Sequence, residues 1–283
     1  MDINIFRRKK KIVVPILTEK KVRETPVRCQ SCGNLIKYED LKENLKVCPY
    51  CGYHFRMAIS ERINLIADSG TFSEIDTEIK AVDMLDFKAL LAYKERIKQT
   101  KNETGLDCAV ITGKVKIGGF NAAVGVFAFE FIGGSLGSAT GEKLTRLIEY
   151  AKKRKLPLII VFSSGGERIQ EGIYSLLQVA KIIQAVDSFK KSGGLFMPIL
   201  TNPSYCGAAA IAMTGNIIIA EKGSSIGISG PRITKEVAKQ NIPDKLKQAE
   251  SLFQNGFLDI VVDRYLLKAT IIQILKHYNR RAI

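Results

Sequence analysis

The chain has 283 residues, of which 46% are hydrophobic. This size allows one large globular domain, or a main domain with a small module attached, and the composition excludes global disorder. No apolar stretch approaches the roughly 20 residues of a membrane-spanning helix, so we expect no membrane insertion. The formal net charge of +15 favours polyanionic partners such as nucleic acid, phosphorylated cofactors or an acidic protein.

The basic residues are concentrated at the N-terminal end. Residues 1–60 contain 13 Lys or Arg and 6 Asp or Glu, a surplus of +7 in about a fifth of the chain. Residues 1–25 are therefore either a segment that attracts a polyanion or a solvated basic tail. The start, Met1–Phe6 followed by a run of Arg and Lys, lacks the apolar region and small-residue cleavage site of a signal peptide. We expect a cytoplasmic protein.

Four cysteines form two CxxC pairs separated by fifteen residues, which is the spacing of a zinc ribbon: Cys29, Cys32, Cys48 and Cys51. A glycine follows each pair, where a tight turn often needs positive φ. Four thiolates would close a tetrahedral, structural site, and we predict a ribbon over residues 26–58. His54 is then more simply a surface or packing residue than a ligand. Cys108, outside the pairs, is expected to be a buried small hydrophobe.

Residues 59–283 are predicted to form an α/β domain. Helical spacing is present at 62–66 and 87–93, with a break at 69–71. From residue 109, two β-prone runs joined through Gly118 and Gly119 predict a hairpin. The elements expected after it are a helix over 141–155, a buried strand over 157–162, a helix from about 170, a strand–helix–strand unit at 197–200, 208–213 and 217–220, and closing helices near 232–240, 244–255 and 265–278.

Three glycine-bearing segments lie where predicted strands lead into helices: residues 131–138, 163–172 and 204–209. Glycine lets the backbone approach a ligand closely, and a helix start presents free N–H groups. Two such groups aimed at one point make an oxyanion hole. Each segment alone could equally be an ordinary loop, and together they do not name a reaction.

The chain contains two histidines, His54 and His277, and neither neighbours a glycine segment in sequence. A Ser-His-Asp or Cys-His hydrolase is therefore poorly supported, and the sequence has no GxxxxGK[ST] phosphate loop. This scarcity of acid–base groups favours enolate stabilisation by backbone N–H groups, with the proton taken by a cofactor or by the other substrate.

Taken together, the motifs resemble the β subunit of the acetyl-CoA carboxylase carboxyltransferase of bacteria and plastids. The resemblance covers about residues 27–265 and rests on the cysteine ribbon and on the segments 129–138 with 141–143, 164–172, 220–221, 226–227 and 230–232. It implies a crotonase-like fold of repeated ββα units in a superhelix, together with one structural Zn²⁺ per chain.

The resemblance also implies the activity. A carboxyl group would pass from carboxybiotin, on the biotin carboxyl carrier protein, to acetyl-CoA. This gives malonyl-CoA, in the first committed step of fatty acid biosynthesis. The implied partners are an α subunit in an α2β2 assembly, the carrier protein and biotin carboxylase. Released biotin would take the proton.

By analogy with crotonase-type folds, four residues are predicted to stabilise the oxyanion through backbone N–H groups: Gly165, Gly166, Gly207 and Ala208. The CoA pocket is predicted at four others: Gly133, Gly134, Ser135 and Gly137. Arg168 is expected to order its loop through Glu171 rather than to touch substrate.

Two positions depart from the family pattern. Glu167 stands where the family usually has Ala, and Cys206 replaces the first glycine of a Gly-Gly pair. A backbone N–H can still serve there if φ stays negative. The alternatives left open are a divergent acyl-CoA carboxyltransferase subunit, a zinc-ribbon regulatory protein that binds RNA or DNA, and a stand-alone crotonase-fold hydratase or isomerase, which the lack of paired carboxylates disfavours.

Overall fold

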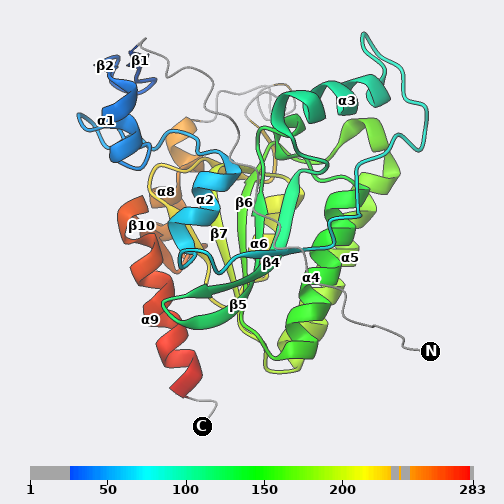
Figure 1. Cartoon of the computed structure of the whole chain (residues 1–283). Helices are drawn as coiled ribbons and strands as arrows, with labels where there is room; N and C mark the ends of the chain where they lie inside the picture. The colour runs from blue at the N-terminus through cyan, green and yellow to red at the C-terminus, as the bar shows by residue number, and fades with distance from the viewer. Residues whose placement is uncertain (1–25, 231–235, 237–242, 281–283) are drawn as a thin grey trace, which may run out of the picture.

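The computed structural model describes residues 26–230, 236 and 243–280 (Figure 1). The basic segment 1–25 lies outside the described residues, as does nearly all of the helix predicted over 232–240. Within the described residues, no helix has the length and apolarity needed to cross a bilayer.

The predicted hairpin is confirmed. Strands β4 (Val110–Ile117) and β5 (Phe120–Phe127) pair antiparallel along their whole length. Gly118 and Gly119 turn between them at φ +57° and +82°, which glycine adopts without a steric penalty. A short strand that the sequence did not suggest, β3 (Ser73–Ile75), adds to the outer edge of β4.

From β5 onward the sheet is parallel, as repeated strand–helix units require. Its order is β10-β8-β7-β6-β5-β4-β3, with β9 beside the end of β7. The parallel strands are β6 (Leu158–Ser164), β7 (Phe196–Tyr205), β8 (Ile219–Glu221), β9 (Ile226–Gly227) and β10 (Ile260–Val262). Strand β7 is ten residues long, whereas the apolar run at 197–200 predicted only part of its first half.

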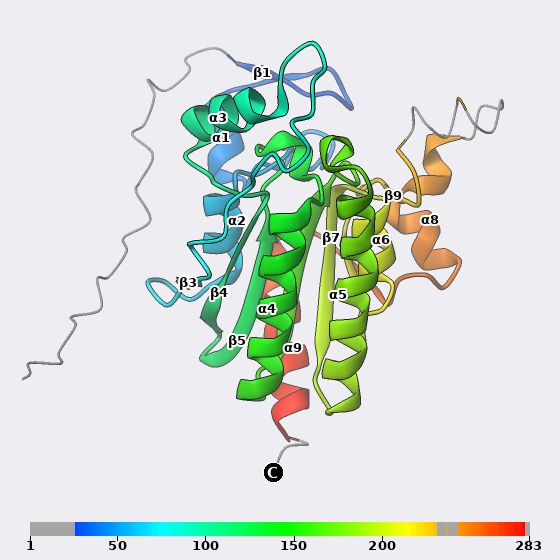
Figure 2. The same ribbon diagram turned by 90° about the vertical axis from the view of Figure 1, so that its right-hand side faces the viewer.

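Helices cover both faces of the sheet. Helices α4 (Ser138–Arg154) and α5 (Ile173–Lys191) lie side by side on one face, and α9 (Leu267–Arg280) lies on the opposite face (Figure 2). Strand β6 shows why: Leu158, Ile160 and Phe162 belong to the core beneath α4 and α5, and the alternating Ile159 and Val161 to the core beneath α2 (Ile59–Ile66) and α9. The predicted layered α/β class is confirmed.

Two local predictions need correction. The helical spacing at 87–93 does not form a helix; α3 begins at Tyr93 and runs to Thr104. Leu90 and Leu91 are exposed, so no apolar surface opposes that stretch. The helix expected over 244–255 is split into a 3₁₀ turn at Asp244–Lys247 and the short α8 (Ala249–Gln254).

Candidate active site and zinc site

The four ribbon cysteines converge on one point. Their Sγ atoms all lie within 4.8 Å of one another, with Cys29 to Cys51 at 3.7 Å and Cys32 to Cys48 at 3.8 Å. Four thiolates at a Zn–S distance of about 2.3 Å in a tetrahedron are separated by about 3.8 Å. The donor set therefore fits zinc closely, and these residues form the structural zinc site of the chain.

The ribbon scaffold is small. Strands β1 (Val27–Arg28) and β2 (Leu35–Ile36) pair antiparallel and lead into α1 (Tyr38–Glu43). Gly33 and Gly52, at φ +75° and +72°, each donate an N–H to the carbonyl of the first cysteine of their knuckle. The predicted turn role of these glycines is confirmed.

His54 takes no part in the zinc cluster and is buried in the seam between the ribbon and the α/β domain. Its Nδ1 lies 3.7 Å from the carboxylate of Glu221. That carboxylate also binds the guanidinium groups of Arg62 and Arg264. Arg264 in addition donates to the carbonyls of Leu45 and Lys46 in the ribbon, at 2.9 and 3.1 Å.

We call Arg62, Glu221, Arg264 and His54 the seam cluster. Burial alone would raise the pKa of Glu221, but the charges of Arg62 and Arg264 hold it well below its usual value. The carboxylate is therefore ionised and links strand β8, which carries Glu221, to the ribbon. Sequence reasoning missed this cluster; its one local signal is a charged residue, Glu221, at the end of an apolar strand.

The structure brings the three glycine segments together at the carboxyl ends of β6 and β7. Gly165 donates its N–H to the carbonyl of Gly133 at 2.9 Å, which joins the first segment to the second. Gly207 donates its N–H to Oε1 of Glu167 at 2.7 Å, which joins the second to the third. Segments from three separate parts of the sequence thus form one continuous surface.

These contacts limit which backbone donors are available. Of the four predicted oxyanion donors, the N–H groups of Gly165 and Gly207 are engaged as above, and that of Gly166 points to Oγ of Ser164 at 3.2 Å. The N–H of Ala208 has no acceptor among the described residues. Ala208 itself is fully buried in the core beneath α4 and α5, so a substrate reaches its N–H only if the surroundings move. The assignment of catalytic roles to these four residues stays a prediction.

Arg168 orders the loop, as expected, rather than facing solvent. It is buried and donates through Nε and Nη2 to Oγ and the carbonyl of Ser135, and through Nη1 to Oη of Tyr93 at 2.7 Å. Tyr93 in turn donates to Glu171 at 2.6 Å, and the other Glu171 oxygen accepts the N–H of Ser138 at 2.6 Å. This chain of contacts fixes the first two segments to each other. Tyr93, which sequence reasoning did not single out, is its centre.

The four residues predicted for the CoA pocket differ in their surroundings. A Cβ on Gly134 would lie 2.0 Å from the carbonyl oxygen of Ser163, and one on Gly137 would lie 2.6 Å from Glu171. These two glycines allow close packing. The Ser135 hydroxyl is occupied by Arg168 and the carbonyl of Ile132. Gly133, at φ +67°, is the one of the four beside open space. Their binding role stays a prediction.

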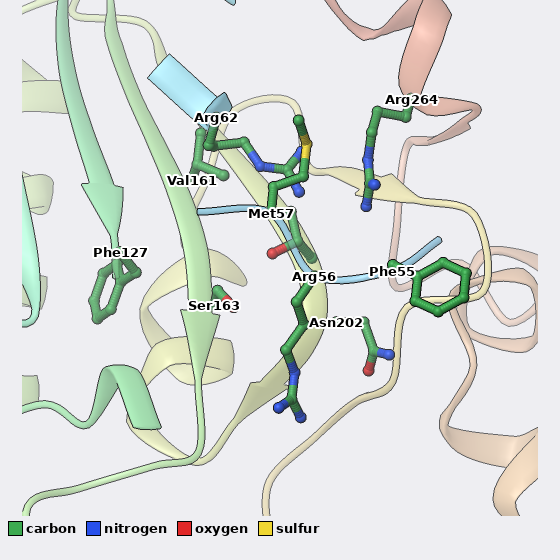
Figure 3. Close-up of a pocket in the computed structure, with 10 residues that line it drawn as sticks. Phe55, Arg56, Met57, Arg62, Phe127, Val161, Ser163, Asn202 and Arg264 are labelled. Atoms are coloured by element: carbon green, nitrogen blue, oxygen red, sulfur yellow. The ribbon is translucent and has the colours of Figure 1, made fainter. Parts of the chain in front are cut away.

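A small cavity lies next to the second segment, between the ribbon linker and the sheet. Figure 3 shows Arg62 and Arg264 at one end of it, with Ser163 and Asn202 on either side of Arg56 towards the other. Its volume of about 10 Å³ holds about one water molecule. This cavity lies between the seam cluster and the glycine segments and is too small to hold a cofactor.

Comparison with known proteins agrees with this geometry. The carboxyl transferase domain family matches residues 55–273, and the acetyl-CoA carboxylase zinc finger domain family matches residues 27–51. An acetyl-coenzyme A carboxylase carboxyl transferase subunit beta from Synechococcus sp. (strain WH7803) is 42% identical, over 95% of this chain and 93% of that protein. The chloroplastic subunit of Pyropia yezoensis is 43% identical, over 89% of this chain and 88% of that protein.

Among solved structures, transcarboxylase 12S with bound methylmalonyl-coenzyme A has a TM-score of 0.65 at 25% identity. The match covers 78% of this chain, which spans 40% of the transcarboxylase chain. A Pseudomonas malonate decarboxylase hetero-tetramer shares the fold, with a TM-score of 0.64 at 18% identity over 79% of this chain and 82% of that one.

The fold and these matches define a carboxyl transferase. The chain belongs to the family of acetyl-CoA carboxylase carboxyl transferase beta subunits. The predicted family, crotonase-like fold, enzyme class and structural zinc are thereby confirmed.

Proposed function

We propose that this chain transfers a carboxyl group from carboxybiotin to the methyl carbon of acetyl-CoA, forming malonyl-CoA. In the transfer, the N–C bond of carboxybiotin breaks, a C–C bond forms at the acetyl methyl group, and biotin takes the methyl proton. The chain must hold the thioester so that negative charge can develop on its oxygen. This proposal rests on one observation, that the three glycine segments are joined at the carboxyl ends of β6 and β7.

The backbone N–H of Ala208, at the start of α6 (Gly207–Ala212), has no acceptor among the described residues. A fixed backbone donor aimed at a developing oxyanion is worth about 2.7–4 kcal/mol of transition-state stabilisation. Neither histidine lies at the glycine segments to transfer a proton. His54 is buried in the seam cluster, and His277 is on α9, across the sheet from α4 and α5. A mechanism in which biotin takes the proton fits this arrangement.

We further propose that the chain works with a carboxyltransferase α subunit in an α2β2 assembly, supplied by a biotin carboxyl carrier protein and biotin carboxylase. Of the four predicted pocket residues, Gly133 is the one that borders open space, which supports a pocket completed by a second polypeptide. The proposed compartment is the cytoplasm, where the free thiols of this chain persist.

The test is the reverse reaction. The chain is purified alone and with a co-expressed α subunit, and biocytin-dependent decarboxylation of malonyl-CoA is measured. We expect activity from the pair and none from the chain alone. Robust activity of the isolated chain would contradict the split site, and a stable pair without activity would contradict the proposed reaction.

RNA binding by the ribbon remains a prediction with less support. Of the four ribbon aromatics, Tyr50 is exposed, whereas Tyr53 and Phe55 stack edge-to-face and Tyr38 lies under the ammonium of Lys46. One exposed ring is a weak platform for base stacking. A salt-dependent filter-binding titration with single-stranded RNA, compared between the wild type and Tyr50→Ala, would test it.

A further inference from the structure

Glu167 and Cys206 lie where the second and third glycine segments meet. The Glu167 carboxylate accepts the N–H of Gly207 at 2.7 Å, and its charge acts on the neighbouring Cys206 thiol. The Cys206 sulfur also lies against the second segment, since a Cβ on Gly166 would be 2.9 Å from it. Glu167 and Cys206 are therefore one local unit, which we call the acid–thiol pair.

The backbone at Cys206 is strained to make this contact. Its φ is +56° and its ψ is −129°, a conformation that glycine adopts easily and a side-chain-bearing residue does not. The condition set for this backbone N–H to serve, a negative φ, is therefore not met. Such strain persists only where the surroundings hold it; here the Cys206 N–H is bonded to the carbonyl of Gly227 at 2.9 Å.

The carboxylate occupies one of the four backbone donors predicted to bind the thioester oxygen. Gly207 is one of the predicted oxyanion donors, and its N–H now points at a full negative charge. A hydrogen bond from a backbone N–H to a carboxylate is stronger than one to a neutral thioester oxygen. A carboxylate at this position also repels an enolate that forms beside it.

We propose that Glu167 is a specificity-determining residue that competes with the acyl-CoA thioester oxygen for the Gly207 N–H. The inference rests on the proposed function. Acyl-CoA binds productively when the carboxylate leaves this donor, so that the acid–thiol pair weakens acyl-CoA binding without affecting the carboxybiotin side of the reaction. Burial, and then the charge of Glu167, raise the pKa of Cys206, so the thiol beside the carboxylate stays protonated.

The first test uses the reconstituted complex and three variants. Glu167→Ala removes the competitor. Glu167→Gln keeps an acceptor of the same size without the charge. Glu149→Ala, at an exposed position on α4, is the matched control.

We expect Glu167→Ala to lower the KM for acetyl-CoA and raise kcat/KM by about tenfold, with no change in the KM for the carboxybiotin carrier. Glu167→Gln should give a smaller rise, and Glu149→Ala should match the wild type. If Glu167→Ala and Glu167→Gln both leave kcat/KM for acetyl-CoA unchanged or lower it, competition is refuted. A wild-type complex that forms no malonyl-CoA refutes the proposed function itself.

The second test needs no activity. The zinc-loaded full chain is treated with iodoacetamide across pH 6–10, and labelling of the Cys206 peptide is followed by mass spectrometry. Loss of the Glu167 charge should shift the labelling midpoint of Glu167→Gln to lower pH than that of the wild type. Identical profiles would show that the acid–thiol contact is absent in solution and would overturn the proposal whatever the kinetics.

Discussion

The ribbon and the α/β domain are held together by different forces. The apolar core of the ribbon consists of four buried side chains, Cys29, Ile36, Leu41 and Cys48, two of which are zinc ligands. The α/β domain has two extensive apolar cores, one on each face of an eight-stranded sheet. A segment this short cannot bury enough apolar surface to fold alone, so a metal supplies the free energy. The seam cluster connects the ribbon, which zinc stabilises, to the α/β domain, which its apolar cores stabilise.

The largest effect is expected from a zinc ligand. Cys48→Ala should release the metal and unfold the ribbon, because structural zinc contributes about 10–16 kcal/mol of apparent binding free energy. The sheet should keep its fold. Metal analysis and hydrogen exchange of peptides from 27–55 and 158–164 would check this.

The control for that experiment is Cys108→Ala, since Cys108 is also buried but lies in the α/β core. It should retain one zinc per chain. Full zinc in Cys48→Ala would refute the four-thiolate assignment.

The next largest effect is expected at the seam. Glu221→Gln leaves Arg62 and Arg264 buried without their counter-charge, which costs about 3–5 kcal/mol of unfolding free energy. The folded-state pKa of Glu221 lies below its usual 4.5. Its contribution is therefore present above about pH 4.5 and is lost as the pH falls below that value.

Urea denaturation of Glu221→Gln and the wild type at pH 7 and at lower pH would measure this contribution, with the surface variant Asp187→Asn for comparison. Asp187 pairs with Lys191 on exposed α5, so its loss should cost under about 1 kcal/mol. Equal losses of unfolding free energy for the two variants at pH 7 would mean that the seam cluster contributes no more stability than an exposed ion pair.

The same contrast explains what the sequence could predict. Local patterns were sufficient for the CxxC knuckles, the hairpin through Gly118 and Gly119, and the continuous apolar run of β6, because spacing alone fixes their structure. The seam cluster joins residues 62, 221 and 264, and Tyr93 meets Arg168 across 75 positions. No periodic pattern in the sequence predicts contacts between residues so far apart.

The candidate site shows the same limit. The sequence identified the three glycine segments, and the structure joins them. Their hydrogen-bond partners could not be predicted: the acceptor for Gly165 is Gly133, and the acceptor for Gly207 is the side chain of Glu167. Strand β3 was missed because three residues carry too little alternation.

A smaller effect is expected at Tyr93. Burial raises the pKa of its hydroxyl, which stays protonated and donates to Glu171. Tyr93→Phe leaves buried acceptors without that donor, at a cost of about 1–3 kcal/mol of unfolding free energy. Because the loops of the first two segments loosen, carboxyl transfer should fall while zinc content is unchanged. Unaltered thermal unfolding and activity would remove Tyr93 from the positioning network.

The smallest effect is expected at the hairpin. The N–H of Gly119 and then Lys268 lower the pKa of Asp68 to about 2 from 3.8. Its contribution is present above pH 3.8 and is lost as the pH falls towards 2. Because the site is partly exposed, Asp68→Asn should cost under about 1 kcal/mol at neutral pH. Thermal unfolding at pH 7 and pH 2.5 would measure it, and a difference that grows with acid would contradict the assignment.

The most direct measurement is forward transfer of label. The chain and its α subunit are given acetyl-CoA and biotin carboxyl carrier protein that bears ¹⁴C-carboxybiotin, and the products are separated. We expect labelled malonyl-CoA from the two subunits together and none from either subunit alone. Label that stays on the carrier, with both subunits folded and zinc bound, would contradict it.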